Sequence, residues 1–459
     1  MTYRSRQIIF FSAALLFIIS APFVLLRARG YTLSWESGLR FKKNGLILVD
    51  SLPASARIFL NGNDTKLKTP ARLSYLAPGS YTLALELTGF LPWKERVQVA
   101  EETATFADHI LLTPDPALTP VWSDSPGLKT AVWRDDGRLA AGWFKDNPSY
   151  LILKTADGQP ETSLALPALA SNAEPNFIFS RNGGSLLLLV ADKNKDLHPW
   201  VKILDDEDPW QDLGPYLPRP LLSISWAPDY DNALLFRTSH LTAHFFLASR
   251  TVVPLATVRS EDVLIRSERL VFGRYLITSE AVKKTSSLWR RETFSTNLEL
   301  LAELPYSTGW KLLETPAPAL LAHDQKNNLL YYWAKENAKP RVYPGTGASL
   351  DPNGETLLVW NKNELQVIFI KEARPPKKYA LSSPLQKIIW YPGRPVALLV
   401  GSAAVSTLTT APDSIPNQRE LYTAEKIITA NWAEESRTLA VLSEQEKKRS
   451  LVLVNLPNL

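Results

Sequence analysis

The sequence predicts an all-β protein that is preceded by one apolar N-terminal helix. Short apolar runs alternate with turns along most of the chain, and Pro occurs 34 times in 459 residues. Aromatic residues, which favour strands, are plentiful, with 14 Trp, 15 Tyr and 17 Phe. A sequence pattern that recurs through the C-terminal part indicates a β-structured unit that is repeated many times. The N-terminal part lacks this pattern and indicates a smaller, separate β-module.

Residues 1–30 are predicted to form a short cytoplasmic tail and a transmembrane helix. The run 7–26 contains no charged residue, and as a helix it would extend roughly 30 Å, about the thickness of the hydrocarbon core of a bilayer. Arg residues flank the run on both sides, so the charge bias does not decide its orientation. The run is longer than the apolar region of a cleaved signal peptide. An uncleaved signal-anchor is therefore favoured over cleavage, which predicts a single-pass protein of the cell membrane with the bulk of the chain extracytoplasmic.

Residues 31–112 are predicted to form a small β-sandwich. Alternating apolar and polar residues indicate strands at 46–51, at Arg57–Leu60 and at 81–88. Asn61 and Gly62 predict a tight turn between strands, because both residues tolerate positive φ. A last hairpin is expected to begin at 93–99 and to end at 110–112.

This module resembles the PEGA domain, a small surface-associated β-sandwich named after a Pro-Glu-Gly-Ala turn. The residues that carry the resemblance are Asn61-Gly62, Thr69-Pro70, the segment 76–81, Gly89-Phe90 and Pro92-Trp93. At the naming turn this chain reads Pro53-Ala54-Ser55-Ala56, so the outer two residues fit and the middle two depart. The resemblance implies an architecture and a place at the cell surface, but neither a ligand nor a reaction.

Residues 113–120 contain three Pro and predict a stiff linker. The neighbouring residues 118–122 offer a second reading, in which they join the last repeat and close a ring. The two readings make different topological predictions, since a linker would lie outside any sheet.

Residues 121–459 contain a sequence repeat. In each copy, a strand ends in an apolar or aromatic residue, a polar turn follows, and a second apolar strand comes after the turn. The strand ends fall at residues 133, 179, 226, 350, 390 and 432, and weaker copies near 270 and 310 fill the long gap. A period of about 40–45 residues with several strands per unit is typical of β-propeller blades. The sequence therefore predicts a seven- or eight-bladed β-propeller.

The repeats resemble those of TolB-type and WD40-like propellers, and Ala227-Pro228-Asp229 and Asp351-Pro352-Asn353-Gly354 match best. Four strand ends carry tryptophan, namely Trp133, Trp226, Trp390 and Trp432. Their positions favour packing between adjacent blades over the alternative that some line a sugar-binding surface.

No catalytic, cofactor-binding or metal-binding residue is predicted. The chain has no Cys, which excludes thiol catalysis and Cys-ligated zinc. His240 and His244 are read as blade residues because the segment resembles a strand and lacks the Glu of a zinc protease. The segment 192–196 opens like a calcium loop, but Leu197 replaces the required Gly, and 205–208 is read as a solvated acidic loop.

These observations predict a non-enzymatic binding or scaffolding protein of the cell envelope. Cell-wall glycan or an envelope protein is the expected partner, the chain is expected to be monomeric, and its net charge of +5 without a basic stripe argues against nucleic acid. One alternative is a propeller-type glycan hydrolase or lyase, which would need carboxylates, His or Arg converging on the channel. A second alternative is an extracytoplasmic assembly factor, which would show a large exposed apolar patch.

Overall fold

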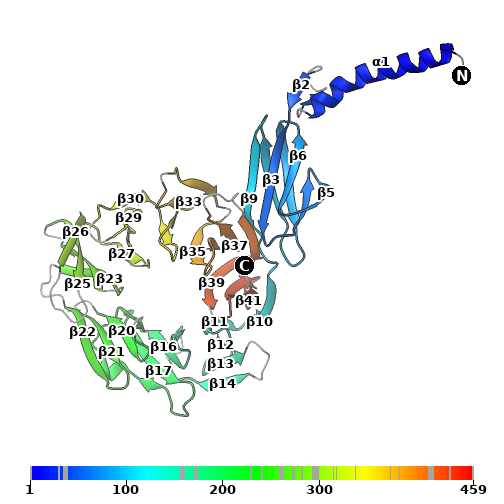
Figure 1. The fold of residues 1–459 in the computed structure, drawn as a ribbon. Coiled ribbons are helices and arrows are strands. Elements are labelled where there is room, and N and C mark those ends of the chain that lie inside the picture. Colours follow the sequence, from blue (N-terminus) through cyan, green and yellow to red (C-terminus); the bar gives the residue numbers. More distant parts are fainter. Residues whose placement is uncertain are drawn as a thin grey trace. The chain divides into compact units, whose positions relative to one another are not determined.

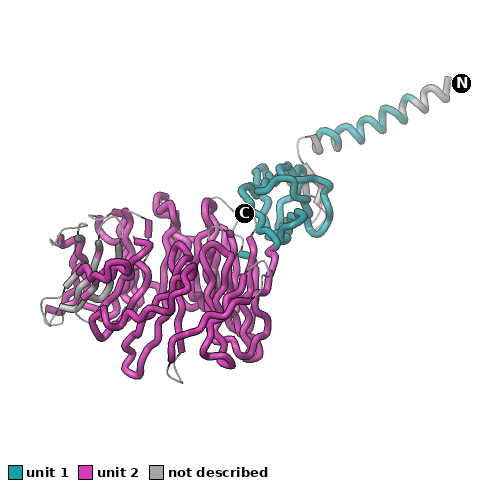
Figure 2. The backbone as a smooth tube through the Cα atoms, turned by 90° about the horizontal axis from the view of Figure 1, so that it is seen from below, with its two compact units in different colours: residues 1–115, 411–419, 459 teal, residues 116–410, 420–458 magenta. Residues whose placement is uncertain are grey.

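The computed structural model divides into two compact units, which Figure 2 colours separately: residues 1–115, 411–419 and 459, and residues 116–410 and 420–458. The structure describes residues 3–28, 31–34, 40–155, 161–169, 174–227, 230–238, 241–257, 263–270, 274–280, 283–291, 299–313, 315–316, 318–335, 338–372, 374–381, 383–411, 418–433 and 436–456.

The first unit begins with a helix and a short strand pair. Helix α1 (Tyr3–Ala28) includes Pro22, and β1 (Tyr31–Ser34) pairs antiparallel with β2 (Arg40–Lys43). Within the part of the chain that the structure describes, no helix combines the length and the apolar character that crossing a bilayer requires. The transmembrane helix predicted at 7–26 is therefore not confirmed.

A two-sheet sandwich follows. One sheet has the strand order β5-β4-β7-β8, and the other has the order β6-β3-β9. The strands are β3 (Gly45–Leu52), β4 (Arg57–Leu60), β5 (Asn63–Lys68), β6 (Ala71–Leu76), β7 (Gly79–Glu86), β8 (Trp93–Val99) and β9 (Ala104–Leu111). Asn61 (φ 51°) and Gly62 (φ 82°) both adopt positive φ between β4 and β5, which confirms the predicted tight turn.

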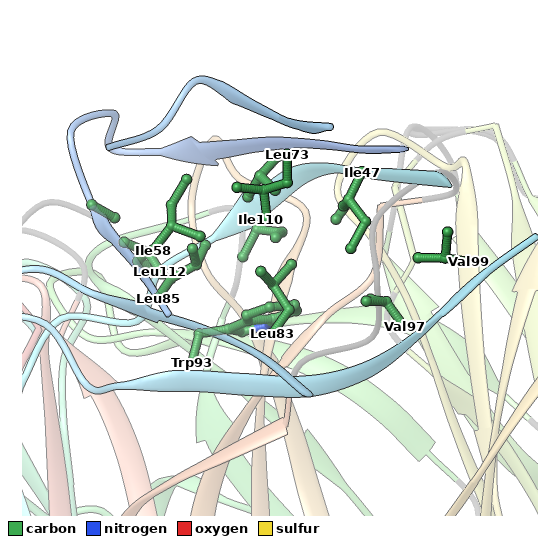
Figure 3. Packing of buried hydrophobic residues seen from close by; sticks show 13 residues of the cluster. Ile47, Ile58, Leu73, Leu83, Leu85, Trp93, Val97, Val99, Ile110 and Leu112 are labelled. Atoms are coloured by element: carbon green, nitrogen blue, oxygen red, sulfur yellow. The ribbon is translucent and has the colours of Figure 1, made fainter. Parts of the chain in front are cut away.

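The two sheets of the sandwich bury one shared core. Ile47 and Ile110 of the β6-β3-β9 sheet pack against Leu83, Leu85 and Trp93 of the β5-β4-β7-β8 sheet (Figure 3). All five side chains are at most 1% exposed. The predicted alternation is visible in β3, where Gly45, Ile47, Val49 and Ser51 are buried and the residues between them are not. One buried face per sheet is what makes this segment a sandwich.

The prediction of a last hairpin was wrong. β8 and β9 do not pair, since β9 crosses to the other sheet and runs parallel to β3, with Leu48 opposite Phe106. The crossing is possible because residue 45 is Gly: a Cβ there would lie 2.4 Å from the carbonyl oxygen of Ala100. β9 also satisfies the edge of β3 that β6 leaves open, so the long buried strand β3 keeps no unpaired edge.

The second unit consists of four-stranded sheets arranged around a ring (Figure 1). We number them ring sheets 1 to 8. Ring sheet 1 comprises β11 (Leu128–Trp133), β12 (Leu139–Phe144), β13 (Tyr150–Thr155) and β14 (Thr162–Ala165); sheet 2, β15 (Asn176–Phe179), β16 (Ser185–Ala191), β17 (Leu197–Ile203) and β18 (Gln211–Asp212); sheet 3, β19 (Ser223–Trp226), β20 (Ala233–Arg237), β21 (Leu241–Phe246) and β22 (Thr251–Thr257); sheet 4, β23 (Val263–Leu270), β24 (Arg274–Glu280), β25 (Thr285–Arg291) and β26 (Glu299–Pro305).

The remaining ring sheets continue the same up-and-down order. Ring sheet 5 comprises β27 (Trp310–Leu313), β28 (Leu320–Asp324), β29 (Leu329–Trp333) and β30 (Arg341–Pro344); sheet 6, β31 (Gly347–Leu350), β32 (Thr356–Trp360), β33 (Glu364–Phe369) and β34 (Lys377–Ala380); sheet 7, β35 (Leu385–Trp390), β36 (Val396–Gly401), β37 (Ala404–Thr409) and β38 (Gln418–Thr423). A short 3₁₀ turn, Gly214–Tyr216, precedes sheet 3.

Ring sheet 8 joins the two ends of the unit. Its strands β39 (Lys426–Ala433), β40 (Thr438–Gln445) and β41 (Lys448–Asn455) come from the C-terminal end, and β10 (Ala117–Ser125) supplies the fourth strand. Leu118 lies opposite Val454, and Trp122 opposite Leu451. Residues 118–122 therefore do close the ring, and β10 begins inside the segment 113–120 that was predicted to be a linker.

The hydrophobic cores of the ring lie between neighbouring sheets. Trp133 and Leu128 of sheet 1 pack with Ala440 and Leu451 of sheet 8, for example. Corresponding clusters join sheets 1 and 2, 2 and 3, 4 and 5, 5 and 6, and 6 and 7. Each sheet in these clusters is thus buried by its neighbours in the ring, and its first strand lies towards the centre (Figure 1).

Candidate functional site

The candidate site is a cavity of about 980 Å³ inside the ring. Its described lining comes from the first strands of ring sheets 1, 2, 6, 7 and 8, together with Asp135 and Pro352, which follow two of these strands, and Thr315 and Pro316, which follow the first strand of sheet 5. In these ring sheets, the cavity is therefore lined by the part of the repeat that the sequence pattern marks, namely the first strand and the turn that follows it.

A recurring turn positions the lining residues. After the first strand, Gly137, Gly183, Gly354 and Gly393 adopt φ between 69° and 73°, which L-residues rarely do. The Gly137 amide donates to the carbonyl oxygen of Arg134 at 2.9 Å, and the Gly183 amide donates to that of Ser180 at 2.9 Å. The glycine of each repeat thus belongs to a tight turn, and this turn fixes the position at which the first strand ends.

The ends of the first strands carry aromatic side chains in five ring sheets. We call these five residues the aromatic arc: Trp390 of sheet 7, Trp432 of sheet 8, Trp133 of sheet 1, Phe179 of sheet 2 and Trp226 of sheet 3. These sheets follow one another around the ring. All but Trp226 line the cavity.

Leucine occupies the matching positions elsewhere in the ring. Leu313 ends the first strand of sheet 5, and Leu350 ends that of sheet 6. One side of the ring therefore presents aromatic strand ends, and the other side presents aliphatic ones.

The indole groups of the aromatic arc reach back to the preceding sheet. Trp226 Nε1 donates to the carbonyl oxygen of Ile178 at 3.0 Å, and Trp390 Nε1 donates to Ser349 Oγ at 2.9 Å. Trp133 packs in the core between sheets 8 and 1, while the ring of Trp432 meets that of Tyr391 edge-on at 5.5 Å. These contacts agree with the predicted packing of Trp133, Trp226, Trp390 and Trp432 between neighbouring sheets.

Two of these indole groups find no hydrogen-bond acceptor within the part of the chain that the structure describes. Trp133 Nε1 and Trp432 Nε1 are buried, and neither has a partner among the described residues. Trp133 is only 5% exposed. Buried donors are nearly always paired in folded proteins, so each such donor requires an explanation, and Trp93 Nε1 and Trp310 Nε1, which are not in the described lining, are unpaired too.

The cavity wall is close to electrically neutral. Asp135 and Lys387 are the charged residues of its described lining, and Lys387 Nζ lies 3.5 Å from the carbonyl oxygen of Ala430. Next to Asp135, burial opposes ionisation of Asp136, but the Arg134 side chain and the Arg138 amide outweigh it and lower the pKa of that carboxyl. The remaining polar lining is uncharged and includes Asn176, Ser349, Thr429 and Asn431.

The four described histidines are not among the lining residues of the cavity. Exposed His109 is on β9, His198 is on β17, and buried His323 is on β28. His244 lies on β21, which agrees with the strand prediction, but it is buried where partial exposure was expected, and His240 falls outside the described residues. The structure therefore does not test the pairing of His240 with His244.

At the acidic loop 192–196 an Arg side chain occupies the candidate metal position, and the acidic loop 205–208 is solvent-exposed. Asp192, Asp196 and His198 place ligand atoms within 4.8 Å of one another, a spacing that could hold a metal ion. However, Arg219 Nη1 already sits 2.8 Å from Asp196 Oδ2 and 3.0 Å from His198 Nε2, which puts a cation in that position. Residues 205–208 are exposed.

Sequence reasoning found the tryptophans but missed the polar lining. Asn176, Ser349, Lys387 and Asn431 belong to the first strands, and nothing in their local sequence distinguishes them from other strand residues. The only available signal was their distance from the repeated strand end, because Ser349 and Asn431 each precede such an end by one residue.

Comparison with known proteins identifies the first module. Residues 44–111 match the PEGA domain. These residues cover β3 to β9, so the PEGA domain corresponds to the two-sheet sandwich. No curated protein matches the chain.

The ring is similar to solved β-propeller structures. The crystal structure of Saccharomyces cerevisiae Sqt1 has a TM-score of 0.50 and 12% identity, and the match covers 74% of this chain and 98% of Sqt1. A eukaryotic initiation factor gives a TM-score of 0.50 and 12% identity, over 75% of this chain and 89% of that one. An oligogalacturonate lyase from Vibrio parahaemolyticus has a TM-score of 0.43 and 8% identity, over 72% and 98%, which is too low to bear on activity. At these identities the likeness shows a propeller-like fold alone.

Proposed function

We propose that this protein is a non-catalytic binding protein in which the ring, an eight-bladed propeller of the TolB or WD40-like kind, binds a partner at its central cavity. The PEGA domain is a companion module that contacts wall polymer or an envelope protein. Location at the cell membrane through residues 7–26 remains a separate prediction, which fractionation of cells that express the full chain would test.

The composition of the cavity wall supports this proposal. A glycan hydrolase or lyase needs an acid and a base that converge on the substrate, and hydrolases place two carboxyl groups roughly 5–10 Å apart. The described lining offers one carboxylate, Asp135, and one amine, Lys387, from opposite neighbours of sheet 8, with neutral and aromatic residues around them. Such a wall is suited to holding a ligand rather than to transferring protons.

The PEGA domain carries a second feature that favours binding. On the outer face of its β6-β3-β9 sheet, Phe106 is 60% exposed and lies opposite half-buried Leu48. Leu52 on the same strand is 48% exposed. Apolar side chains gathered on one exposed face favour contact with a partner surface, which also suits the assembly-factor alternative.

The experiment is retention of the full chain, purified in detergent, on immobilised wall polymer and on immobilised envelope proteins. We expect one of these materials to retain the chain and to remain chemically intact. The variant Phe106→Asp tests whether the PEGA face contributes, with Lys94→Asp on the opposite sheet as a matched control. Release of cleaved glycan that is abolished by Asp135→Asn would instead establish the enzyme alternative.

A further inference from the structure

We infer that the cavity of the ring binds a neutral oligosaccharide, with sugar rings against the four cavity-lining residues of the aromatic arc, Trp133, Phe179, Trp390 and Trp432, and hydroxyl groups against the uncharged polar lining. This inference rests on the proposed binding function and names its ligand class. The volume of about 980 Å³ lies at the upper end of the range of roughly 300–1,000 Å³ that is usual for ligand sites. A chain of a few sugar rings therefore has room in the cavity.

Packing alone does not account for the aromatic arc. Ring sheets 5 and 6 end their first strands with Leu313 and Leu350, so a leucine suffices to fill the space between sheets at this position. Tryptophan appears instead in four of the five consecutive sheets of the arc. An indole offers a flat apolar face together with a polar edge, which matches a sugar ring that has apolar C–H faces and a polar rim.

Two of the cavity-lining tryptophans carry indole donors that have no acceptor among the described residues. Trp226 and Trp390 use their N–H groups on the preceding sheet, but Trp133 and Trp432 find no acceptor among the described residues, although both line the cavity. Sheet 8, to which Trp432 belongs, directly precedes sheet 1, to which Trp133 belongs. Both Nε1 atoms are buried, so a sugar oxygen accepts a hydrogen bond from either indole only when that side chain turns its N–H group towards the cavity.

The charge of the wall selects a neutral ligand. Asp135 and Lys387 offset each other in net charge, and the other polar lining residues are hydroxyls and amides such as Thr130, Asn176 and Thr429. Hydroxyl and amide groups both donate and accept hydrogen bonds, as sugar hydroxyls do. An anionic polymer would require a cluster of cations, and the described lining contains a single Lys.

The test is isothermal titration of the full chain with the neutral trisaccharides chitotriose, cellotriose and maltotriose at millimolar concentration. We expect at least one to bind. Trp432→Ala should weaken that binding by about tenfold or more, since it removes both a ring face and a donor. Trp432→Phe should weaken it less, because the ring face remains.

The matched control is Trp226→Phe. Trp226 belongs to the same arc, but it does not line the cavity and its N–H group is already bonded to Ile178. Its replacement should leave affinity unchanged. Because Trp432→Ala removes a packed side chain, Asn431→Ala provides a second test: Asn431 is a half-buried lining residue whose loss removes polar contact without opening a core.

Two results would overturn the inference: no trisaccharide binds, or binding occurs with the same affinity in Trp432→Ala and Asn431→Ala. If the full chain and both variants are still retained equally by an envelope protein, the proposed binding function stands while the sugar site is rejected. If neither retention nor sugar binding occurs, both proposals fail together.

Discussion

The PEGA domain and the propeller bury their hydrophobic residues in different ways. The PEGA domain has one core, a single cluster of buried side chains between its two sheets. The ring distributes its buried residues over separate clusters, each shared by two neighbouring sheets. A defect in the sandwich is therefore expected to destabilise the whole domain, whereas a defect in the ring should act first on the seam where it lies.

The largest expected effect comes from emptying the centre of the PEGA core. Trp93 on β8 is fully buried, so Trp93→Ala should cost about 3–5 kcal/mol. Hydrogen exchange should then become faster in all strands from β3 to β9 and remain unchanged in the ring sheets. Trp93→Phe is the control: Trp93 Nε1 has no partner among the described residues, so Phe loses no hydrogen bond and should cost far less. Faster exchange confined to β8 would contradict a single shared core.

A smaller, local effect is expected from a polar seam of the ring. Ser307 lies between sheets 4 and 5, and its hydroxyl donates to the buried Asp324 carboxylate and accepts from the Gly309 amide. Asn327 Nδ2 donates to the same carboxylate at 2.6 Å, and Ser279 Oγ donates to the carbonyl oxygen of Ser307 at 2.8 Å. Sheets 4 and 5 are thus joined by hydrogen bonds in addition to hydrophobic contact.

Asp324→Ala should therefore cost about 3 kcal/mol, because it leaves buried donors without an acceptor. Hydrogen exchange should accelerate in β24, β25, β28 and β29 before it does so in the opposite ring sheets. Asp208→Ala, at an exposed loop position, should have little effect. If Asp324→Ala instead accelerates exchange equally in all ring sheets, the ring unfolds as one unit and the contrast with the PEGA domain is lost.

The next seam effect depends on pH. Burial lowers the pKa of His323 on β28, and Lys311 acts in the same direction, against the opposing effects of the Gly345 backbone and Asp324. The folded state thus binds this proton more weakly than the unfolded state does. The contribution of neutral His323 to the free energy of unfolding is therefore fully present above the unfolded pKa of about 6.5, and it is lost as the pH falls below that value.

Lowering the pH from neutral to about 5.5 should therefore destabilise the ring through His323. The measurement is the denaturation midpoint of the ring at several pH values, compared with His323→Gln, which should remove most of the dependence in this range. Equal slopes for the two proteins would show that His323 is not responsible.

The repeated sheets of the ring could be predicted from the sequence, but the strand order of the PEGA domain could not. The tryptophan strand ends and the glycine-containing turns recur at regular spacing, and this periodicity was sufficient to indicate repeated units of several strands, which the structure shows to be four-stranded sheets. The crossing of β9 to β3 was missed, because local patterns in 93–112 are compatible with a hairpin. What decides against the hairpin is the unpaired edge of β3 together with the absence of a Cβ at Gly45, and both are long-range facts.

The candidate site was predictable only in outline. Trp133, Trp390 and Trp432 stood out as strand ends, but their cavity is formed by residues up to 300 positions apart, and no local pattern reports which residues face it. The unpaired state of Trp133 and Trp432 depends on the acceptors that neighbouring sheets offer, which a single strand does not reveal.

The smallest predicted effect concerns the turn at which this PEGA domain departs from its family motif. Ser55 stands at the position of the motif glycine and adopts φ 72°, a conformation that costs an L-residue about 1 kcal/mol relative to glycine. Its amide still donates to the carbonyl oxygen of Thr69 at 2.7 Å, so the turn keeps its hydrogen bond whichever residue is present. Ser55→Gly should therefore stabilise the PEGA domain by up to about 1 kcal/mol and slow exchange in both of its sheets, while Ala54→Gly at the adjacent exposed position should not stabilise it. Slower exchange limited to the turn would show that the single core does not pass a local gain on to the whole sandwich.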